Sequence, residues 1–158
     1  ISAMPTNLYG PNDMYDFEKS HVIPAMLLKV IRAKHEKKSS VVFWGSGKPL
    51  REFLYSDDLA DALVNILENY HHPELINVGS GQEVSIRELA EHICEAVEFN
   101  GAIEWDASKP DGIFRKPMDS SKIHALGWKA KTQLREGLKR VVSEAERQYL
   151  NFVDKISL

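Results

Sequence analysis

The sequence is poor in cysteine, in net charge and in long apolar runs. Cys94 is the single cysteine, so no disulfide can form within the chain, which fits a reducing compartment. Lys and Arg together number 20 and Asp and Glu number 23, giving a formal net charge of -3. This weak bias gives no support to a nucleic-acid or anionic-membrane partner. No apolar run approaches the roughly 18 residues that a membrane-spanning helix needs.

The sequence also lacks a complete phosphate-binding loop. Gly45-Ser46-Gly47 and Gly79-Ser80-Gly81 each follow a short apolar run, but neither completes G-x-G-x-x-G, so we interpret both as tight turns. Tyr15 and Lys19 match the Y-x-x-x-K pattern of short-chain dehydrogenases, a chemistry that needs both side chains on one helical face. Because they fall in a segment rich in Asn, Asp and Pro, we interpret this match as coincidental.

What the sequence does contain is an alternation of short β-type runs with amphipathic helical stripes. Extended runs are expected at 1–8, 41–44, 51–55, 75–78 and 102–105, and helices at 20–34, 56–70, 85–97, 120–126 and 134–149. Ser20 and Ser56 are the expected N-caps of the first two helices, and Ser85 with Glu88 forms a capping box. The runs 41–44 and 51–55 are either a hairpin or two edge strands. The alternation predicts an α/β layer that is incomplete on its own.

An aromatic residue and several cations are candidate ligands for a nucleotide. Trp44 ends a strand beside glycines and is followed by Arg51, and an aromatic face with a planar guanidinium suits a base or sugar and a pyrophosphate. Lys29 and the pair Arg115-Lys116 add charge if they converge in space. His21, at the expected start of the same helix as Lys29, is either a proton shuttle or a capping histidine.

Two other candidates are weaker. Cys94 lies within the apolar stripe of its helix, which is typical of a core residue rather than a nucleophile. His71 and His72 are adjacent and have no further ligands at metal spacing, so no metal site is expected.

Several motifs together resemble one family. Asn7-Leu8-Tyr9-Gly10-Pro11 resembles the Asn-x-Tyr-Gly-Pro loop of extended short-chain dehydrogenases that act on nucleotide sugars. Ser-His-Val-Ile-Pro-Ala at 20–25, Trp-Gly-Ser-Gly-x-Pro-x-Arg-Glu-Phe at 44–53, Asn-Val-Gly-Ser-Gly at 77–81 and Ser-Lys-Pro-Asp-Gly at 108–112 follow in the order and spacing of the GDP-L-fucose synthases. The resemblance covers nearly the whole chain, and it places the sequence among the NAD-dependent epimerases and dehydratases.

The resemblance implies an NADP-dependent enzyme that epimerises GDP-4-keto-6-deoxy-D-mannose at C3 and C5 and reduces C4 to give GDP-L-fucose. In that family the first half carries the Gly-rich NADP loop, the catalytic Tyr/Lys pair and a catalytic Cys, and this sequence has no match for them. Residues 1–158, which open on Ile1 rather than Met, are therefore expected to be one fragment. It would hold the carboxyl-terminal part of a Rossmann-type α/β fold with the mixed α/β substrate-binding lobe, and would be inactive alone. The parent is expected to be a cytoplasmic homodimer.

The resemblance also assigns roles to single residues. The nicotinamide end of NADP would be contacted by Pro5, Thr6, Asn7, Leu8 and His21. His21 would in addition act as the acid in epimerisation. The GDP-sugar would be bound by Lys29, Trp44, Arg51, Asp111 and Lys116. Lys29 stands where some members have Arg, which keeps the charge but loses the planar fork.

Two alternatives remain open from the sequence. One is another nucleotide-sugar enzyme, a GDP- or UDP-sugar 4-epimerase or 4,6-dehydratase, which substrate competition would separate. The other is a non-catalytic module that binds nucleotide sugars. In either case, a fragment that lacks its Rossmann half is expected to expose apolar surface, including residues 1–8, and therefore to self-associate.

Overall fold

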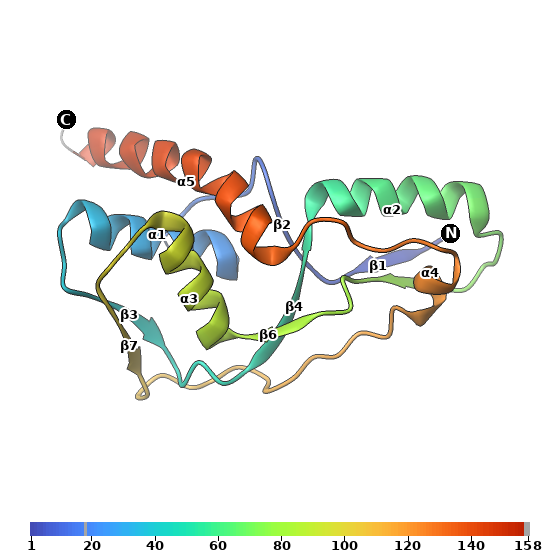
Figure 1. Cartoon of the computed structure of the whole chain (residues 1–158), viewed down its shortest axis with the longest axis horizontal. Coiled ribbons are helices and arrows are strands. Elements are labelled where there is room, and N and C mark those ends of the chain that lie inside the picture. The colour runs from blue at the N-terminus through green and yellow to red at the C-terminus, as the bar shows by residue number, and fades with distance from the viewer. Residues whose placement is uncertain (18, 157–158) are drawn as a thin grey trace.

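The computed structural model describes residues 1–17 and 19–156 and contains both helices and strands (Figure 1). In chain order the elements are β1 (Ala3–Pro5), β2 (Asn7–Tyr9), α1 (Val22–His35), β3 (Ser40–Trp44), β4 (Leu50–Tyr55), α2 (Ser56–Asn69), β5 (Ile76–Val78), β6 (Glu83–Ser85), α3 (Ile86–Val97), β7 (Ala102–Asp106), α4 (Ser121–Ala125) and α5 (Leu134–Ile156). The expected α/β class is confirmed. None of the helices in the described part of the chain combines the length and apolarity of a membrane span.

The strands form three small groups rather than one sheet. β1 pairs with β5 in parallel, and β3 pairs with β7 in parallel. β4 lies between β2, to which it is parallel, and β6, to which it is antiparallel. The hairpin of 41–44 with 51–55 is therefore wrong, and β4 is not an edge strand. β3 follows α1 and β7 follows α3, and these two packed helices bring the strands together in parallel, as helical crossovers do.

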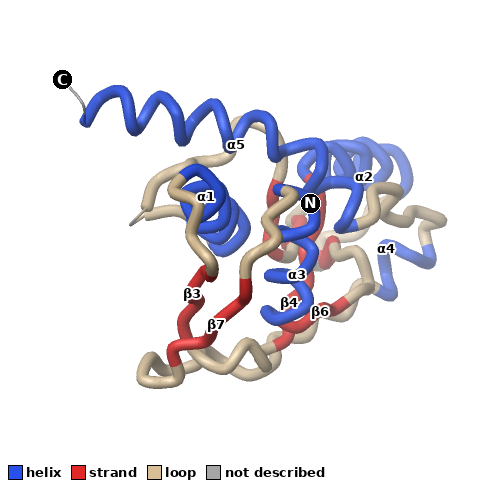
Figure 2. The backbone as a smooth tube through the Cα atoms, turned by 60° about the vertical axis from the view of Figure 1, so that its left-hand side comes forward, coloured by secondary structure: helices blue, strands red, loops and turns tan. Residues whose placement is uncertain are grey.

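Two apolar clusters hold the elements together. The larger one lies where α1, α3 and α5 meet, as Figure 1 and Figure 2 show, and its fully buried members include Leu27, Ile31, Leu89, Ile93 and Leu138. The smaller one joins α2 and α4 to β5, and includes Ile66, Ile76, Val78, Ile123 and Trp128. The helices were predictable from the sequence because the residues that they contribute to these clusters recur at helical spacing.

The helix starts only partly follow the predicted caps. The Ser85 hydroxyl accepts from the Glu88 backbone N–H at 3.1 Å, and the Glu88 carboxylate accepts from the Ser85 N–H at 2.8 Å, so the capping box is confirmed. Ser20 and Ser56 are not caps, since α1 is capped by the backbone of His21 and β4 runs directly into α2. The Ser20 hydroxyl instead donates to the Met14 carbonyl at 2.6 Å and closes the preceding loop.

Tyr15 and Lys19 lie in that loop, outside any helix, so they do not form a helical Tyr/Lys pair. Tyr15 is half-buried against the larger cluster, and burial raises the pKa of its phenol well above the usual value. The coincidental interpretation of this motif is confirmed. Cys94 is buried in the same cluster, where burial raises the pKa of its thiol to about 11, and the core interpretation is confirmed.

Candidate functional site

A pocket of about 290 Å³ lies between β2, the start of α1 and β4. Its lining comprises Thr6, Asn7, Leu8, His21, Val22, Ile23 and Phe53. Four of the five residues expected at the nicotinamide thus line one pocket. They come together in space although a long loop separates β2 from α1 in the sequence. Pro5, the fifth, ends β1 directly before the pocket and is not part of its lining.

The pocket lies where the chain changes its strand partner. β1 pairs with β5, and two residues later β2 pairs with β4. At the crossing, the Thr6 backbone N–H donates to the Val78 carbonyl at 3.0 Å, while its hydroxyl donates to the Glu52 carbonyl at 3.1 Å. In open α/β folds, ligands bind in crevices outside the carboxyl ends of parallel strands, and Thr6 directly follows the carboxyl end of β1.

Asn7 and His21 line this pocket from two different elements, β2 and the N-cap of α1. The Asn7 side-chain amide donates to the Glu52 carbonyl at 2.8 Å, which fixes the direction of β2. His21 is exposed at the N-cap of α1, and its carbonyl accepts from the Ala25 N–H at 3.0 Å, while its side chain makes no capping bond. The main chain of His21 is therefore fixed at the start of α1, while its imidazole remains available to a ligand in the pocket.

Glu52, to which the sequence assigned no role, supports both β2 and the segment 79–81. Its side chain is only 4% exposed, and its carboxylate accepts from the Gly81 N–H at 2.7 Å and the Ser80 hydroxyl at 3.3 Å. A Cβ on Gly79 would come within 2.4 Å of the carboxylate, so this position requires glycine. A glutamate inside the apolar run 51–55 was the signal that a buried polar contact was needed.

A second group of expected residues meets at the end of β3. Trp44 is 67% exposed, and the Lys29 ammonium lies 4.8 Å from the centroid of its ring. Lys29 comes from α1, so the helix and strand place the cation on the indole, which is a favourable cation–π geometry. Burial lowers the pKa of Lys29. The predicted convergence of Lys29 and Trp44 is present in the structure.

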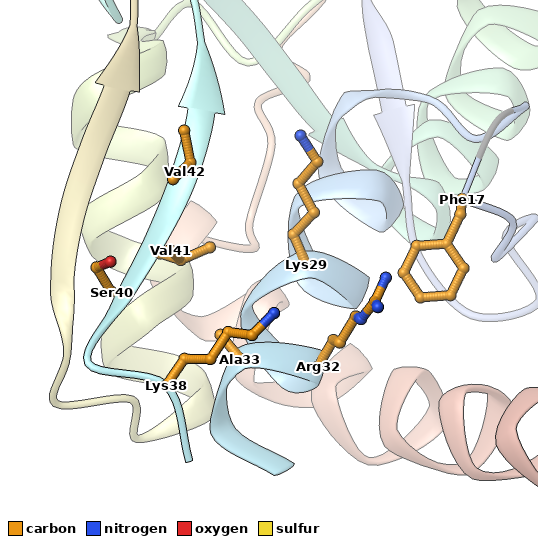
Figure 3. Close-up of a pocket in the computed structure, with 8 residues that line it drawn as sticks. All are labelled: Phe17, Lys29, Arg32, Ala33, Lys38, Ser40, Val41 and Val42. Carbon is orange, nitrogen blue, oxygen red and sulfur yellow. The ribbon is translucent and has the colours of Figure 1, made fainter. Parts of the chain in front are cut away.

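Lys29 also borders a pocket of about 310 Å³ between α1 and β3, shown in Figure 3. Arg32 and Lys38 extend into the same space, but both form ion pairs with Glu36, at 2.8 Å and 2.6 Å. Within residues 1–17 and 19–156, Lys29 has no such carboxylate partner. Its charge is thus available to an anionic ligand.

Asp111 is engaged by the turn that follows Trp44. Its two carboxylate oxygens accept from the Ser46 backbone N–H at 2.8 Å and from the Ser46 hydroxyl at 2.7 Å. These two hydrogen bonds, the hydroxyl first, lower the pKa of Asp111. Gly45 has φ +79°, and a Cβ there would approach the carboxylate to 2.3 Å, which explains the glycine. The chain bends here, with Gly45 and Gly47 at positive φ, and Asp111 fastens loop 107–118 to this bend.

The remaining expected ligands lie along the same loop. Arg51 is half-buried on β4, and its guanidinium lies so close to Gly112 that a Cβ there would be 3.3 Å from Nη2. Arg115 is held by a bidentate contact with Glu83, with Nε 2.9 Å from Oε2, so its charge is already paired. Lys116 is exposed next to it. Arg51 and Asp111 are therefore brought to one surface, while Arg115 serves to anchor the loop.

Comparison with known proteins agrees with this arrangement. The profile described as the NAD dependent epimerase/dehydratase family matches residues 1–79. The chain is 57% identical to GDP-L-fucose synthase 1 of Arabidopsis thaliana, over 87% of this chain and 43% of that protein. It is 47% identical to the GDP-L-fucose synthase of Sinorhizobium fredii, over 99% of this chain and 48% of that protein.

A solved structure shows the same similarity. The crystal structure of a GDP-L-fucose synthetase from Naegleria fowleri bound to NADP superposes with a TM-score of 0.87 at 35% identity, over 94% of this chain and 47% of that one. The chain thus spans about half the length of the relatives that it matches, and the expected similarity to GDP-L-fucose synthases is confirmed. On the family profile, the relatives and the fold, this chain belongs to the NAD dependent epimerase/dehydratase family.

Proposed function

We propose that this chain is the substrate-binding half of an NADP-dependent GDP-L-fucose synthase. The complete enzyme would convert GDP-4-keto-6-deoxy-D-mannose to GDP-L-fucose by epimerisation at C3 and C5 and reduction at C4. The observation that carries the proposal is the pocket that is lined by Thr6, Asn7, Leu8 and His21, where the chain passes from β1 to β2. The proposal also includes a companion Rossmann half, a homodimeric parent and a cytoplasmic location.

The residues of the pocket fit the nicotinamide end of the cofactor. Leu8 and Val22 are 38% and 43% exposed, so they offer an apolar wall to a flat ring at the pocket. Thr6 and Asn7 keep the adjacent backbone fixed through the Glu52 carbonyl. When bound, NADPH supplies the hydride for the reduction at C4. Binding of the remainder of the cofactor is proposed to depend on the companion half, which would carry the Gly-rich loop.

His21 is the catalytic residue that this chain contributes to the proposal. The 4-keto group of the substrate acidifies the C–H bonds at C3 and C5, so a base removes one proton at a time and leaves an enolate. Protonated His21 then donates a proton to that carbon on the opposite face, which inverts the centre. The exposed imidazole at the start of α1, which makes no capping bond of its own, supports this role.

The nucleotide end is proposed to bind at the surface around Trp44. The indole would stack on the base or a sugar ring, while Lys29, Arg51 and Lys116 would neutralise the diphosphate. Asp111 has both oxygens engaged by Ser46, which supports an indirect contribution, through the position of its loop. This assignment requires that a guanine nucleotide binds better than its uracil counterpart.

Calorimetric titration of the 158-residue chain with GDP, UDP and NADPH tests the proposal. We expect saturable binding of GDP, weaker binding of UDP, and loss of most GDP affinity in Trp44→Ala. Leu67→Ala is the matched control, since Leu67 is an equally exposed apolar residue, at 69%, on the remote helix α2. Preference for UDP would contradict the GDP assignment in favour of another nucleotide-sugar enzyme, and no binding of any nucleotide would contradict a preformed substrate lobe.

A further inference from the structure

A second lysine, Lys109, lies against Trp44; it belongs to the Ser-Lys-Pro-Asp-Gly motif at 108–112, but the resemblance assigned it no role. The Lys109 ammonium is 5.8 Å from the centre of the Trp44 ring, beside the 4.8 Å approach of Lys29. The two lysines come from α1 and from loop 107–118, so distant parts of the chain place two positive charges on one exposed indole. Like charges repel, and their convergence here is therefore unfavourable unless something offsets it.

Contacts that precede and follow Lys109 in the chain fix its position. Trp44 and Asp106 are register partners in the parallel pair β3 and β7, so the loop that leaves β7 starts beside the indole. The Lys109 N–H donates to the Asp106 carbonyl at 3.2 Å, and the Ser108 N–H donates to the Asp106 carboxylate at 3.0 Å. Two residues later, Asp111 fastens the loop to Ser46.

Hydrogen bonds from Ser108 and, to a smaller extent, the charge of Lys109 lower the pKa of Asp106, so carboxylates balance the charges at this surface only in part. In the part of the chain that the structure describes, neither Lys29 nor Lys109 lies within ion-pair distance of an acidic side chain. The nearest acidic groups of the loop, Asp106 and Asp111, accept hydrogen bonds from Ser108 and Ser46. Two ammonium groups flanking a π-face match a ligand with a ring next to a doubly charged anion.

We infer that Lys109 binds the diphosphate of the nucleotide sugar, with Lys29 as its counterpart on the other segment. The inference rests on the proposed function and deepens it, because it assigns to loop 107–118 a direct contact with the anion. The contacts of the loop at Asp106 and at Asp111 then set the distance between the Lys109 ammonium and the indole.

The test compares GDP with guanosine, which has the same base and ribose but no phosphate. In Lys109→Met, GDP affinity measured by calorimetry is expected to fall about tenfold, as for the loss of one charge-assisted hydrogen bond. Guanosine affinity is expected to remain unchanged, and Lys109→Arg is expected to retain GDP binding. Lys48→Met is the matched control, because Lys48 carries the same charge on the neighbouring turn and is close enough to lower the pKa of Asp111.

Each other outcome overturns the inference. An equal loss for GDP and guanosine would mean that Lys109 only supports Trp44, and an equal loss in Lys48→Met would mean a general electrostatic effect. Unchanged GDP affinity in Lys109→Met would remove Lys109 from the site while leaving the proposed function intact. Failure of the unaltered chain to bind GDP would instead contradict a preformed substrate lobe in this chain, and this assignment with it.

Discussion

At the scale of single residues, Asp111 is a motif residue whose carboxylate is engaged within the chain itself. Its sequence context, Lys-Pro-Asp-Gly, suggested a substrate-binding carboxylate. In the structure both of its oxygens accept from Ser46, and Gly45 has no side chain that would obstruct them. A carboxylate beside a diphosphate would also be repelled by it, so a role in holding the loop is physically the better one.

This arrangement predicts a coupled effect of Asp111 and Ser46 on GDP binding. Asp111→Ala and Ser46→Ala are each expected to weaken GDP affinity severalfold, because the loop that carries Lys109 is released. The double variant is expected to be no weaker than Asp111→Ala alone, since Asp111→Ala already removes the Ser46 hydroxyl contact that Ser46→Ala removes, together with the contact to the Ser46 backbone N–H. Calorimetric titration of the three variants checks this, and additive losses would show that Asp111 contacts the ligand independently.

The same contact has a defined dependence on pH. The pKa of Asp111 is lowered in the folded chain, so the ionised form that accepts from Ser46 is stabilised. The contribution is therefore present above the ordinary carboxyl pKa of about 4 and is lost as the pH falls through the lowered value. The severalfold effect of Asp111→Ala should accordingly persist from pH 8 to pH 5.

At the scale of the elements, β4 is the strand that organises both the core and the pocket. It pairs with β2 and β6, and its residue Glu52 joins β2 to the turn 79–81 through backbone and side-chain contacts. The sequence showed a short apolar run here but not its central place, because strand order depends on contacts between residues that lie far apart in the chain.

Removal of the Glu52 carboxylate is expected to destabilise the fold. Glu52→Ala removes the carboxylate that accepts from the Gly81 N–H and the Ser80 hydroxyl, and the loss of these two hydrogen bonds is expected to cost about 1–3 kcal/mol in the free energy of unfolding. Glu104→Ala is the control, since Glu104 is an exposed glutamate on β7. Urea unfolding followed by circular dichroism measures both, and equal stabilities would contradict the supporting role of Glu52.

What the sequence could predict at this scale follows from the range of the interactions. The helices around Leu27, Leu89 and Leu138 were predictable because their apolar residues recur at helical spacing, and the Ser85 cap is local. The pairing of β3 with β7 was not, because it is set by how α1 and α3 pack. Likewise, Lys109 was one charge in a polar loop until the register of Trp44 with Asp106 placed it.

At the scale of the whole molecule, a stripe of apolar side chains remains exposed on α2. Leu63, Val64 and Leu67 are 41%, 56% and 69% exposed and recur at helical spacing, so they form a continuous surface. Exposed patches of this kind are typical of surfaces that bind another protein. The expectation that the chain self-associates therefore stays a prediction, with a surface on which to test it.

Sedimentation over a range of concentrations is expected to show reversible association of the chain. Leu67→Glu should shift the equilibrium toward the monomer by introducing a charge into the apolar stripe. Asn69→Glu introduces the same charge on α2, outside the stripe, and should leave the association unchanged. A monomer at all concentrations, or equal effects of the two variants, would contradict the prediction.

The crossing at Thr6 has a mechanical consequence for the molecule. One residue bonds to β5 through its N–H and to the β4 backbone through its hydroxyl, so it joins the smaller apolar cluster to the larger one. The pocket opens at this joint, and a molecule seated there touches β2, α1 and β4 at once. Occupancy of the pocket is therefore expected to restrain the joint at Thr6, so that the two apolar clusters unfold together rather than one after the other.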